Sequence, residues 1–423
     1  MDFQNTLDFA KALDTSDKLK SFRDEFLIPF NNGKPSIYFT GNSLGLQPKK
    51  TKEIIFQELD DWAKYGVEGH FMASRPWVSY HELFPSLLSP IIGGHSSEIV
   101  AMNQLTSNLH FLFVSFYRPT KSRYKIIMEG KAFPSDQYAV ESQVKFHGFL
   151  PDDAIIEVFP REGETCLRTE DIIDAIEKNK ETIALVFFSG VNYYTGQVFD
   201  MKSIAKKTQE INTVCGFDLA HAAGNVELHL HDWGVDFAAW CSYKYLNSGP
   251  GGVGGAFIHE KHSKEFSLPR FTGWWGHDKS TRFKMDKTFV PMHGAEGWQL
   301  SNAPVLSMAA HYASLKVFEE AGFKNLLEKS KNLTDYLVFL IKELNESGKI
   351  NIITPLESPE RGCQISLLLK NNGKQVYDGL FKEGVIVDWR EPNVIRLAPV
   401  PLYNNFVDVF GFAKKLEKLI ENI

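Results

Sequence analysis

Short apolar runs alternate with amphipathic stretches between about residues 97 and 260, and this alternation restricts the fold more than any other feature. The runs at residues 124–128, 182–188 and 235–241 have the length and the β-branched or aromatic content of buried strands. Residues 169–176 have the apolar spacing of an amphipathic helix. Strands that alternate with helices predict a mainly parallel sheet covered on both faces, with a functional site at the carboxyl ends of the strands.

One lysine stands where such a site is expected. Lys244 lies between Tyr243 and Tyr245, just after the run at 235–241, and is well placed to be desolvated and act as an amine nucleophile. Asp218 ends a neighbouring run in the same way. A surface lysine and a capping aspartate are commoner roles for each residue alone. The pair indicates pyridoxal phosphate (PLP), whose aldehyde a lysine binds as a Schiff base and whose pyridinium a carboxylate keeps protonated.

Other residues fit such a site, each with a plainer alternative. Thr106 or Ser107 is expected to cap a helix whose free N–H groups can bind a phosphate. Phe133 can lie on a pyridine ring or belong to the core. Arg396 is a lone arginine in an apolar strand, so it requires either a protein acid or the α-carboxylate of an amino-acid substrate.

Three further patterns are expected to carry no chemistry of their own. Residues 249–254 match the glycine string of dinucleotide binders, but a strand follows instead of a helix, so a tight turn beside the cofactor is expected. His229 and His231 have metal-like spacing, but we expect no completed ligand set and no metal site. Cys363 opens a strand, where a buried structural cysteine is commoner than a nucleophile.

Composition limits the classes of function and the compartment. The chain has 423 residues, 43% of them hydrophobic, which is enough for two lobes with a large core. A net charge of -6 without a basic run argues against a nucleic-acid partner. No apolar run approaches the roughly 18 residues that span a bilayer, and the first residues lack the pattern of a signal peptide. Four scattered cysteines without a CxxC pair favour a reduced, cytoplasmic protein.

The two ends of the chain predict a smaller α+β unit. Gln47 and Pro48 are expected to open a helix, because proline suits a first helical turn. Two helices are expected over about residues 303–345, and a last helix carries Phe410 and Leu416. Strands are expected at residues 350–353, 364–369 and 385–388.

Several stretches together resemble the kynureninase family. They are residues 38–48, 133–136, 194–197, 217–222, 240–255, 273–277 and 396–403. The resemblance implies an aminotransferase-like PLP-dependent fold of type I, with a mostly parallel seven-stranded sheet in a large domain and a smaller α+β domain. It implies a large domain over residues 70–305, a small domain of residues 1–69 with 306–423, and a homodimer.

The resemblance also implies the site residues. Lys244, Tyr243 and Asp218 are implied to be catalytic. Cofactor contacts are implied for Leu105, Thr106, Phe133, Pro134, Ser135, Asp136, Ser189, Asp218, His221, Tyr243, Lys244, Trp274 and Asn302. Substrate contacts are implied for Ser43, His70, Ser301, Asn302 and Arg396, with Trp274 and Asn302 donated across the dimer interface.

The family reaction is hydrolysis of the Cβ–Cγ bond of L-kynurenine or 3-hydroxy-L-kynurenine, to anthranilate or 3-hydroxyanthranilate and L-alanine. It serves tryptophan and kynurenine catabolism or NAD precursor synthesis. His70, Ser301 and Asn302 favour a ring hydroxyl, although the same groups can bind the ring amine. The nearest rival is a related lyase such as a cysteine desulfurase that uses Cys363. A PLP-binding regulator is disfavoured, because such a protein requires an added DNA-binding domain.

Overall fold

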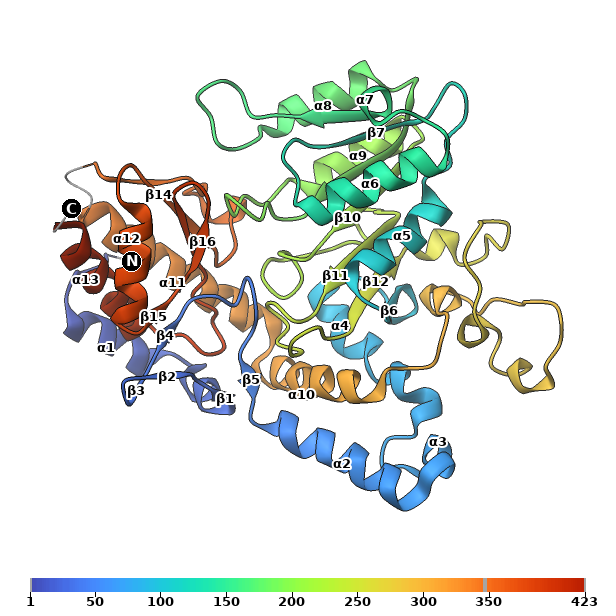
Figure 1. Ribbon diagram of the computed structural model, residues 1–423, viewed down its shortest axis with the longest axis horizontal. Helices are drawn as coiled ribbons and strands as arrows, with labels where there is room; N and C mark the ends of the chain where they lie inside the picture. The colour runs from blue at the N-terminus through green and yellow to red at the C-terminus, as the bar shows by residue number, and fades with distance from the viewer. Residues whose placement is uncertain (1, 345–347, 422–423) are drawn as a thin grey trace.

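The computed structural model describes residues 2–344 and 348–421, and its centre is a seven-stranded sheet (Figure 1). Its strands are β6 (Ile99–Ala101), β7 (Lys125–Glu129), β8 (Ile155–Val158), β9 (Ile183–Ser189), β10 (Val214–Asp218), β11 (Phe237–Cys241) and β12 (Gly254–Ile258). Their order is β6-β12-β11-β10-β9-β7-β8. The pairs from β11 to β8 are parallel, and β12 runs antiparallel to both of its neighbours. The prediction of a mostly parallel seven-stranded sheet is confirmed.

Helices cover both faces of this sheet, as the apolar runs predicted. Along β9, Leu185 and Phe187 pack with helices α5 (Leu105–Phe116) and α6 (Pro134–Phe146), whereas Val186 and Phe188 pack with α8 (Thr169–Lys178), α9 (Met201–Glu210) and α10 (Val305–Ala321). Successive side chains of a strand point to opposite faces, so a strand covered twice must be apolar at every position. This is why the strands read as continuous apolar runs.

A second, smaller unit combines the two ends of the chain (Figure 1). It has an antiparallel sheet in the order β13 (Ile350–Ile352), β14 (Ile365–Leu369), β17 (Val394–Leu397), β16 (Asp388–Arg390). Helices α1 (Leu7–Ser16), α11 (Phe323–Leu344), α12 (Gly373–Lys382) and α13 (Phe406–Glu421) surround it. Ala10 and Phe39 from the N-terminal segment belong to the same apolar core as Leu337 and Phe412. Residue 345, the end of the expected helical stretch, lies outside the described residues.

Two local predictions were wrong because contacts distant in sequence override local preference. Gln47 and Pro48 form strand β5, which pairs with β1 (Phe26–Leu27), and helix α2 (Lys50–Tyr65) begins only after it. The run expected as one strand at 385–388 is divided. Val385 and Ile386 form β15, which pairs in parallel with β4 (Ile37–Tyr38), while Asp388 starts β16 in the other sheet.

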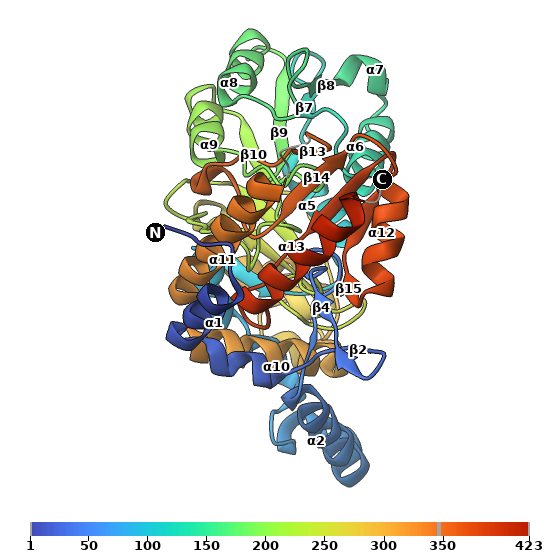
Figure 2. The same cartoon turned by 90° about the vertical axis from the view of Figure 1, so that its left-hand side faces the viewer.

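The N-terminal segment runs from the smaller unit to the large domain. Its remaining short strands, β2 (Phe30–Asn31) and β3 (Lys34–Pro35), form a hairpin in the part that precedes the large domain. Helix α2 and the short helix α3 (Gly69–Met72) project from the body at the lower edge of both views (Figures 1 and 2). Within the described residues, every helix is too short or too polar to cross a bilayer.

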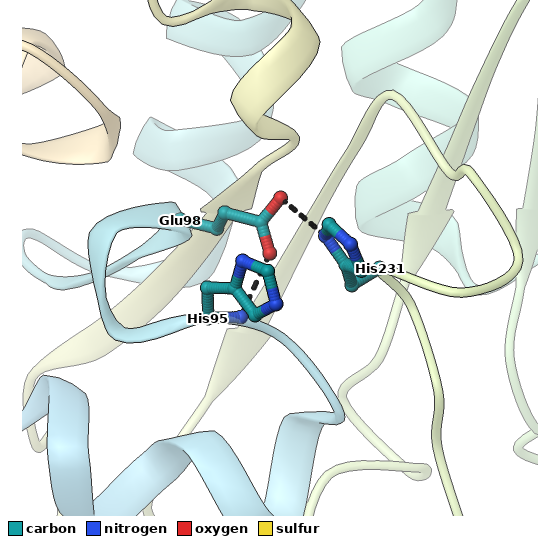
Figure 3. A group of neighbouring side chains, drawn as sticks. All are labelled: His95, Glu98 and His231. Carbon is teal, nitrogen blue, oxygen red and sulfur yellow. Dashed lines mark hydrogen bonds and ion pairs between the residues drawn. The ribbon is translucent and has the colours of Figure 1, made fainter.

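A buried carboxylate joins three segments at the edge of the sheet away from β8 (Figure 3). Glu98 is fully buried and accepts hydrogen bonds from the backbone N–H groups of His95 (2.8 Å) and Glu260 (2.8 Å) and from His231 Nδ1 (2.9 Å). The rings of His95 and His231 stack at 3.9 Å. The expectation that no carboxylate accompanies the histidine at 231 was therefore wrong. The carboxylate is saturated by this capping arrangement, so we interpret the group as a structural latch.

The latch predicts a pH-dependent stability. Burial raises the pKa of Glu98, but the hydrogen bonds from His231 and the backbone outweigh it, so that the pKa of Glu98 is lowered overall. The hydrogen bond to Glu98 in turn raises the pKa of His231. The Glu98 contribution is thus lost as the pH falls below the ordinary glutamate pKa of about 4.3, and the His231 contribution is lost as the pH rises above about 6.5. The charged pair is most stabilising between these two values.

We expect His231→Asn, which keeps a neutral N–H donor, to lower the free energy of unfolding by about 0.5 kcal/mol at pH 5.5, a small value because His231 is partly exposed. At pH 9 the histidine is itself neutral, so the difference should nearly vanish. Urea unfolding of both proteins at the two pH values measures this. An equal loss at both values would contradict the charged latch.

Candidate active site

The site lies at the carboxyl ends of the central strands, in a cavity of about 600 Å³. Adjacent strands β7, β9 and β10 end in Glu129, Ser189 and Asp218, which all line this cavity. Lys244 enters it from the turn after β11. The parallel sheet therefore brings together side chains that are distant in the sequence, as expected for strands of one direction.

The turn that carries Lys244 is packed against the N-terminal segment. The Gly45 N–H donates to the Tyr243 carbonyl at 2.8 Å. A Cβ atom on Gly45 would lie 2.4 Å from the Lys244 carbonyl oxygen, so only glycine permits this approach. This contact also brings Ser43 and Asn42 to the cavity wall.

Lys244 and His221 form the basic centre of the cavity. Lys244 Nζ lies 2.9 Å from His221 Nε2, and 5.9 Å from the centre of the Phe133 ring. Burial, and then the Lys244 charge, lowers the pKa of His221 well below its ordinary value, so this imidazole is neutral. Its Nδ1 atom is buried and has no protein partner. A buried polar atom without a partner indicates a place for a ligand group.

Two acids face this centre. Asp218 is buried and accepts the Ala220 N–H at 2.7 Å. Burial, and then the charge of Asp218, raises the pKa of Asp136 well above its ordinary range, so Asp136 keeps its proton and hydrogen-bonds Asp218. Burial raises the pKa of Asp218 as well, but the hydrogen bond from Asp136 and the Lys244 charge lower it. Asp218 is therefore the ionised member, which is the charge state that a pyridinium partner needs.

Helix α5 begins at the other side of the cavity. Gln104 is its N-cap, whereas Thr106 and Ser107 lie inside the first turn, so the expectation that one of them caps the helix was wrong. The Gln104 side chain makes no capping hydrogen bond to the first N–H groups of this helix. Gln104, Leu105, Thr106 and Ser107 all line the cavity. Free N–H groups at a helix start, flanked by hydroxyls, suit a phosphate.

Arg396 has the protein acid that the sequence left open. It is buried in β17, pairs with Asp388 on the neighbouring strand β16, and donates to the Tyr193 carbonyl at 2.6 Å. Its Nε atom is buried without a partner. Arg390 also pairs with Asp388, at 3.3 Å, and lines the cavity beside Arg396. One carboxylate thus orients two guanidinium groups, and a donor remains free for a second anion.

Most of the residues expected at the site are brought together. The cavity lining includes Ser43, Leu105, Thr106, Phe133, Ser135, Asp136, Ser189, Asp218, His221, Tyr243, Lys244 and Arg396. Among the described residues, the lining does not include Pro134, His70, Trp274, Ser301 or Asn302. Pro134 is the first residue of α6. Trp274 is 46% exposed and donates to the Arg282 carbonyl at 3.0 Å.

Sequence reasoning missed Glu129, Tyr193 and Arg390. Glu129 ends an apolar run just as Asp218 does, and that position was the available signal. Arg390 lies on β16, so its position at the cavity depends on the approach of the small domain to the large one, which has no local signal. Tyr193 lies four residues after the end of β9, at the same edge of the sheet as Ser189.

The patterns set aside in the sequence behave as structural features. Gly249 and Gly251 have φ of 87° and 63°, and Gly251 lines the cavity, consistent with a tight turn beside a ligand. Cys363 is buried, is not among the lining residues, and burial raises the pKa of its thiol to about 12. Such a thiol is a poor nucleophile.

The residues present fit pyridoxal phosphate. A lysine, an ionised aspartate, a helix start and an imidazole with a free buried nitrogen converge on one cavity that also contains the Phe133 ring. The donor set provides one group each for an aldehyde, a ring nitrogen and a phosphate.

Comparison with known proteins gives a consistent result. Residues 326–416 match the model of the kynureninase C-terminal domain. The chain is 56% identical to kynureninase of Flavobacterium psychrophilum, with all of both chains covered. It is 48% identical to the human kynureninase, with 98% of this chain and 93% of the relative covered.

Solved structures support the fold alone. An apo cysteine desulfurase from Thermococcus onnurineus NA1 has a TM-score of 0.77 and 18% identity, and covers 96% of this chain and 98% of its own. The cystine C–S lyase C-DES, in complex with cysteine persulfide, has a TM-score of 0.76 and 16% identity, with 90% and 97% covered. At such identity, shared architecture does not define the reaction.

Proposed function

The chain belongs to the kynureninase family, and we propose that its cavity hydrolyses the Cβ–Cγ bond of L-kynurenine or 3-hydroxy-L-kynurenine. The products are anthranilate or 3-hydroxyanthranilate and L-alanine. The observation that carries this proposal is the convergence of Lys244, Asp218 and buried Arg396 on one cavity, in a chain 48–56% identical to kynureninases over nearly full length.

When bound, pyridoxal phosphate supplies a cationic ring that stabilises negative charge on the substrate carbon next to the amino group. We propose that Asp218 holds the proton on the ring nitrogen, and that the start of α5 binds the phosphate. Phe133 and His221 would enclose the ring, and Ser135 and Ser189 would contact it. These assignments are supported by the position of each residue in the cavity wall.

The substrate is oriented by its carboxylate. Arg396 has a free Nε donor at the cavity and is fixed by Asp388 and the Tyr193 carbonyl, so it can bind a carboxylate in one orientation. That orientation directs the adjacent C–H bond towards Lys244, whose amino group removes the proton as general base.

Tyr243 is the proposed proton donor in the cleavage step. It lines the cavity next to Lys244, and burial raises the pKa of its hydroxyl, which therefore remains protonated. A protonated phenol can deliver a proton to the carbon left by C–C cleavage and be restored by solvent.

The direct experiment incubates the PLP-loaded protein with L-kynurenine and with 3-hydroxy-L-kynurenine separately. We expect anthranilate-type fluorescence and alanine release, and the ratio of the two kcat/KM values gives the ring preference. Lys244→Ala should abolish turnover, and Cys363→Ala should leave it unchanged. A PLP-bound protein inert to both substrates, but active on cysteine in a Cys363-dependent way, would overturn the proposal.

The two aspartates provide a matched pair of variants. Asp218→Asn should keep some cofactor but lower kcat by at least about 100-fold, because the charge that holds the ring proton is lost. Asp136→Asn imitates the protonated acid already present, so its kcat should fall less than about tenfold. Steady-state kinetics and cofactor stoichiometry measure both. Unchanged turnover of Asp218→Asn would refute its role.

We further propose that the enzyme is a homodimer whose sites are completed by the partner. Large apolar side chains are exposed on the projecting α2–α3 region, including Trp62, Val67 and Phe71. His70 lies in that region, and Trp274 lies in the 266–290 segment, which exposes Phe266, Phe271, Phe283 and Met285. Exposed apolar patches around polar site residues support an interface between copies of the chain.

Mixing two inactive variants tests this arrangement. Lys244→Ala and Asn302→Ala should each be nearly inactive alone. After unfolding and refolding together, about a quarter of wild-type activity should return, since half of the dimers are mixed and each contains one intact site. If Asn302 serves the site of its own chain, no mixed dimer has an intact site and no activity returns.

We place this enzyme in the cytoplasm, since all four cysteines are free thiols, as is usual in a reducing compartment.

A further inference from the structure

Glu129 is a buried acid at the active site that the reaction described above does not use. Glu129 is the last residue of β7. The adjacent strand β9 ends in Ser189, and the next strand, β10, ends in Asp218. The Glu129 side chain is 1% exposed, yet it lines the cavity. No ion pair involves it among the described residues. A buried carboxyl group without a cation is costly in free energy unless hydrogen bonds or a bound proton stabilise it.

The two carboxyl oxygens of Glu129 serve different parts of the site. One oxygen accepts the Ser189 hydroxyl at 2.5 Å. The other accepts the Asn192 amide at 3.2 Å, and Asn192 in turn accepts the N–H groups of Tyr194 (3.0 Å) and Thr195 (2.9 Å). The carboxyl group therefore connects a hydroxyl on the proposed cofactor side with the loop at residues 192–195.

That loop belongs to the substrate side. The Tyr193 carbonyl accepts Arg396 Nη1 at 2.6 Å, and the Tyr193 ring packs edge-on against Phe133 with ring centres 5.1 Å apart. The Glu129 contact with Asn192 therefore helps to hold the loop that contacts Arg396, together with Gln364 at the Tyr193 carbonyl (3.0 Å) and Ser366 at the Tyr194 carbonyl (2.7 Å).

The charge state of Glu129 is balanced near neutrality. The net pKa of Glu129 is raised to about 7: burial raises it most, the hydrogen bonds from Ser189 and Asn192 lower it, and the Asp218 charge raises it. The other ionisable side chains at the cavity are Asp136 on α6, Tyr193 after β9, Asp218 and His221 at and after the end of β10, Cys241, Tyr243 and Lys244 at and after the end of β11, and Arg390 and Arg396 from the small domain. Asp136 and His221 are neutral, so the charges around Glu129 come from Asp218, Lys244 and the two arginines.

We propose that Glu129 is a positioning residue whose protonation state sets the direction of the Ser189 hydroxyl hydrogen. When Glu129 is ionised, the Ser189 O–H must donate to it, and Ser189 offers only lone pairs to the cavity. When Glu129 takes up one proton from the cavity, it donates to Ser189 Oγ, and the Ser189 hydrogen is released to donate to a ligand. The proposal rests on the assignment of Ser189 as a cofactor contact.

The isosteric variant Glu129→Gln isolates this effect. An amide can donate to Ser189 and accept from Asn192, so it imitates the protonated carboxyl group at every pH. Glu98→Gln is the matched control, because Glu98 is an equally buried, hydrogen-bonded glutamate outside the cavity. Ser189→Ala removes the hydroxyl through which the change is transmitted.

The readout is the visible absorption of bound pyridoxal phosphate between pH 5.5 and 9, without substrate, together with cofactor Kd from titration of the apo-protein. We expect a transition with a midpoint near neutrality, and a Kd change of at least about threefold across it, in the wild type and in Glu98→Gln. Glu129→Gln should lack both, with a spectrum like that of the acidic wild type. Ser189→Ala should lack them too.

Two results would overturn the inference. One is a neutral transition in Glu129→Gln equal to that of the wild type. The other is its persistence in Ser189→Ala, which would mean that Glu129 acts by charge alone. If Glu129→Gln fails to fold or to bind cofactor, Ser189→Ala still tests the inference: loss of the neutral transition in this variant supports it, and persistence of the transition overturns it. Because no substrate is present, failure to cleave kynurenine would remove the proposed function without affecting this measurement.

Discussion

Burial of the central sheet on both faces is the constraint on which the rest of the structure depends. Every strand residue that faces a helix layer must be apolar, so the polar side chains of β7, β9 and β10 are confined to the ends of the strands, and Glu129, Ser189 and Asp218 stand at the carboxyl ends. Since these strands are parallel neighbours, Glu129, Ser189 and Asp218 meet in one row. The positions of these three polar side chains thus follow from the covering of the sheet, because a sheet covered on both faces can have polar side chains only at the ends of its strands.

Together with Asp136, this row contains more carboxyl groups than a buried site can keep ionised. Asp136 shares its proton with Asp218, Glu129 is balanced between its two forms, and Asp218 carries the negative charge opposite Lys244. Burial thereby gives three similar carboxyl groups three different states. The same architecture at 16–18% identity serves proteins that act on sulfur, whereas Cys363 of this chain is buried outside the cavity. Fold and chemistry are therefore separable here.

Much of the fold and part of the site could be predicted without coordinates. The mainly parallel sheet, its two-faced covering and the strand-end pair Lys244 and Asp218 followed from the apolar runs and from the residues that end them, whereas the number of seven strands was implied by the resemblance to the family. Thr106 and Ser107 were wrongly expected as caps, because composition does not reveal which residue leaves the helical conformation first. Pro48 was wrongly assigned to a helix, because its pairing with Phe26 is a contact across 22 residues of sequence.

The sequence by itself determined the buried apolar runs of the sheet, the positions of Lys244 and Asp218 just after two of them, and the resemblance to the family, since these depend on local spacing and on motifs. Only the tertiary structure decided that Asp388 orients both Arg390 and Arg396, that Asn192 connects Glu129 to the loop holding Arg396, and that Glu98 joins His95 to His231. Glu129 and Asn192 are 63 residues apart and Glu98 and His231 are 133 residues apart, whereas Asp388 and Arg396 meet because β16 pairs with β17. The free energies of these contacts depend on the desolvation and the relative positions of the groups, and both arise only when the elements have packed together.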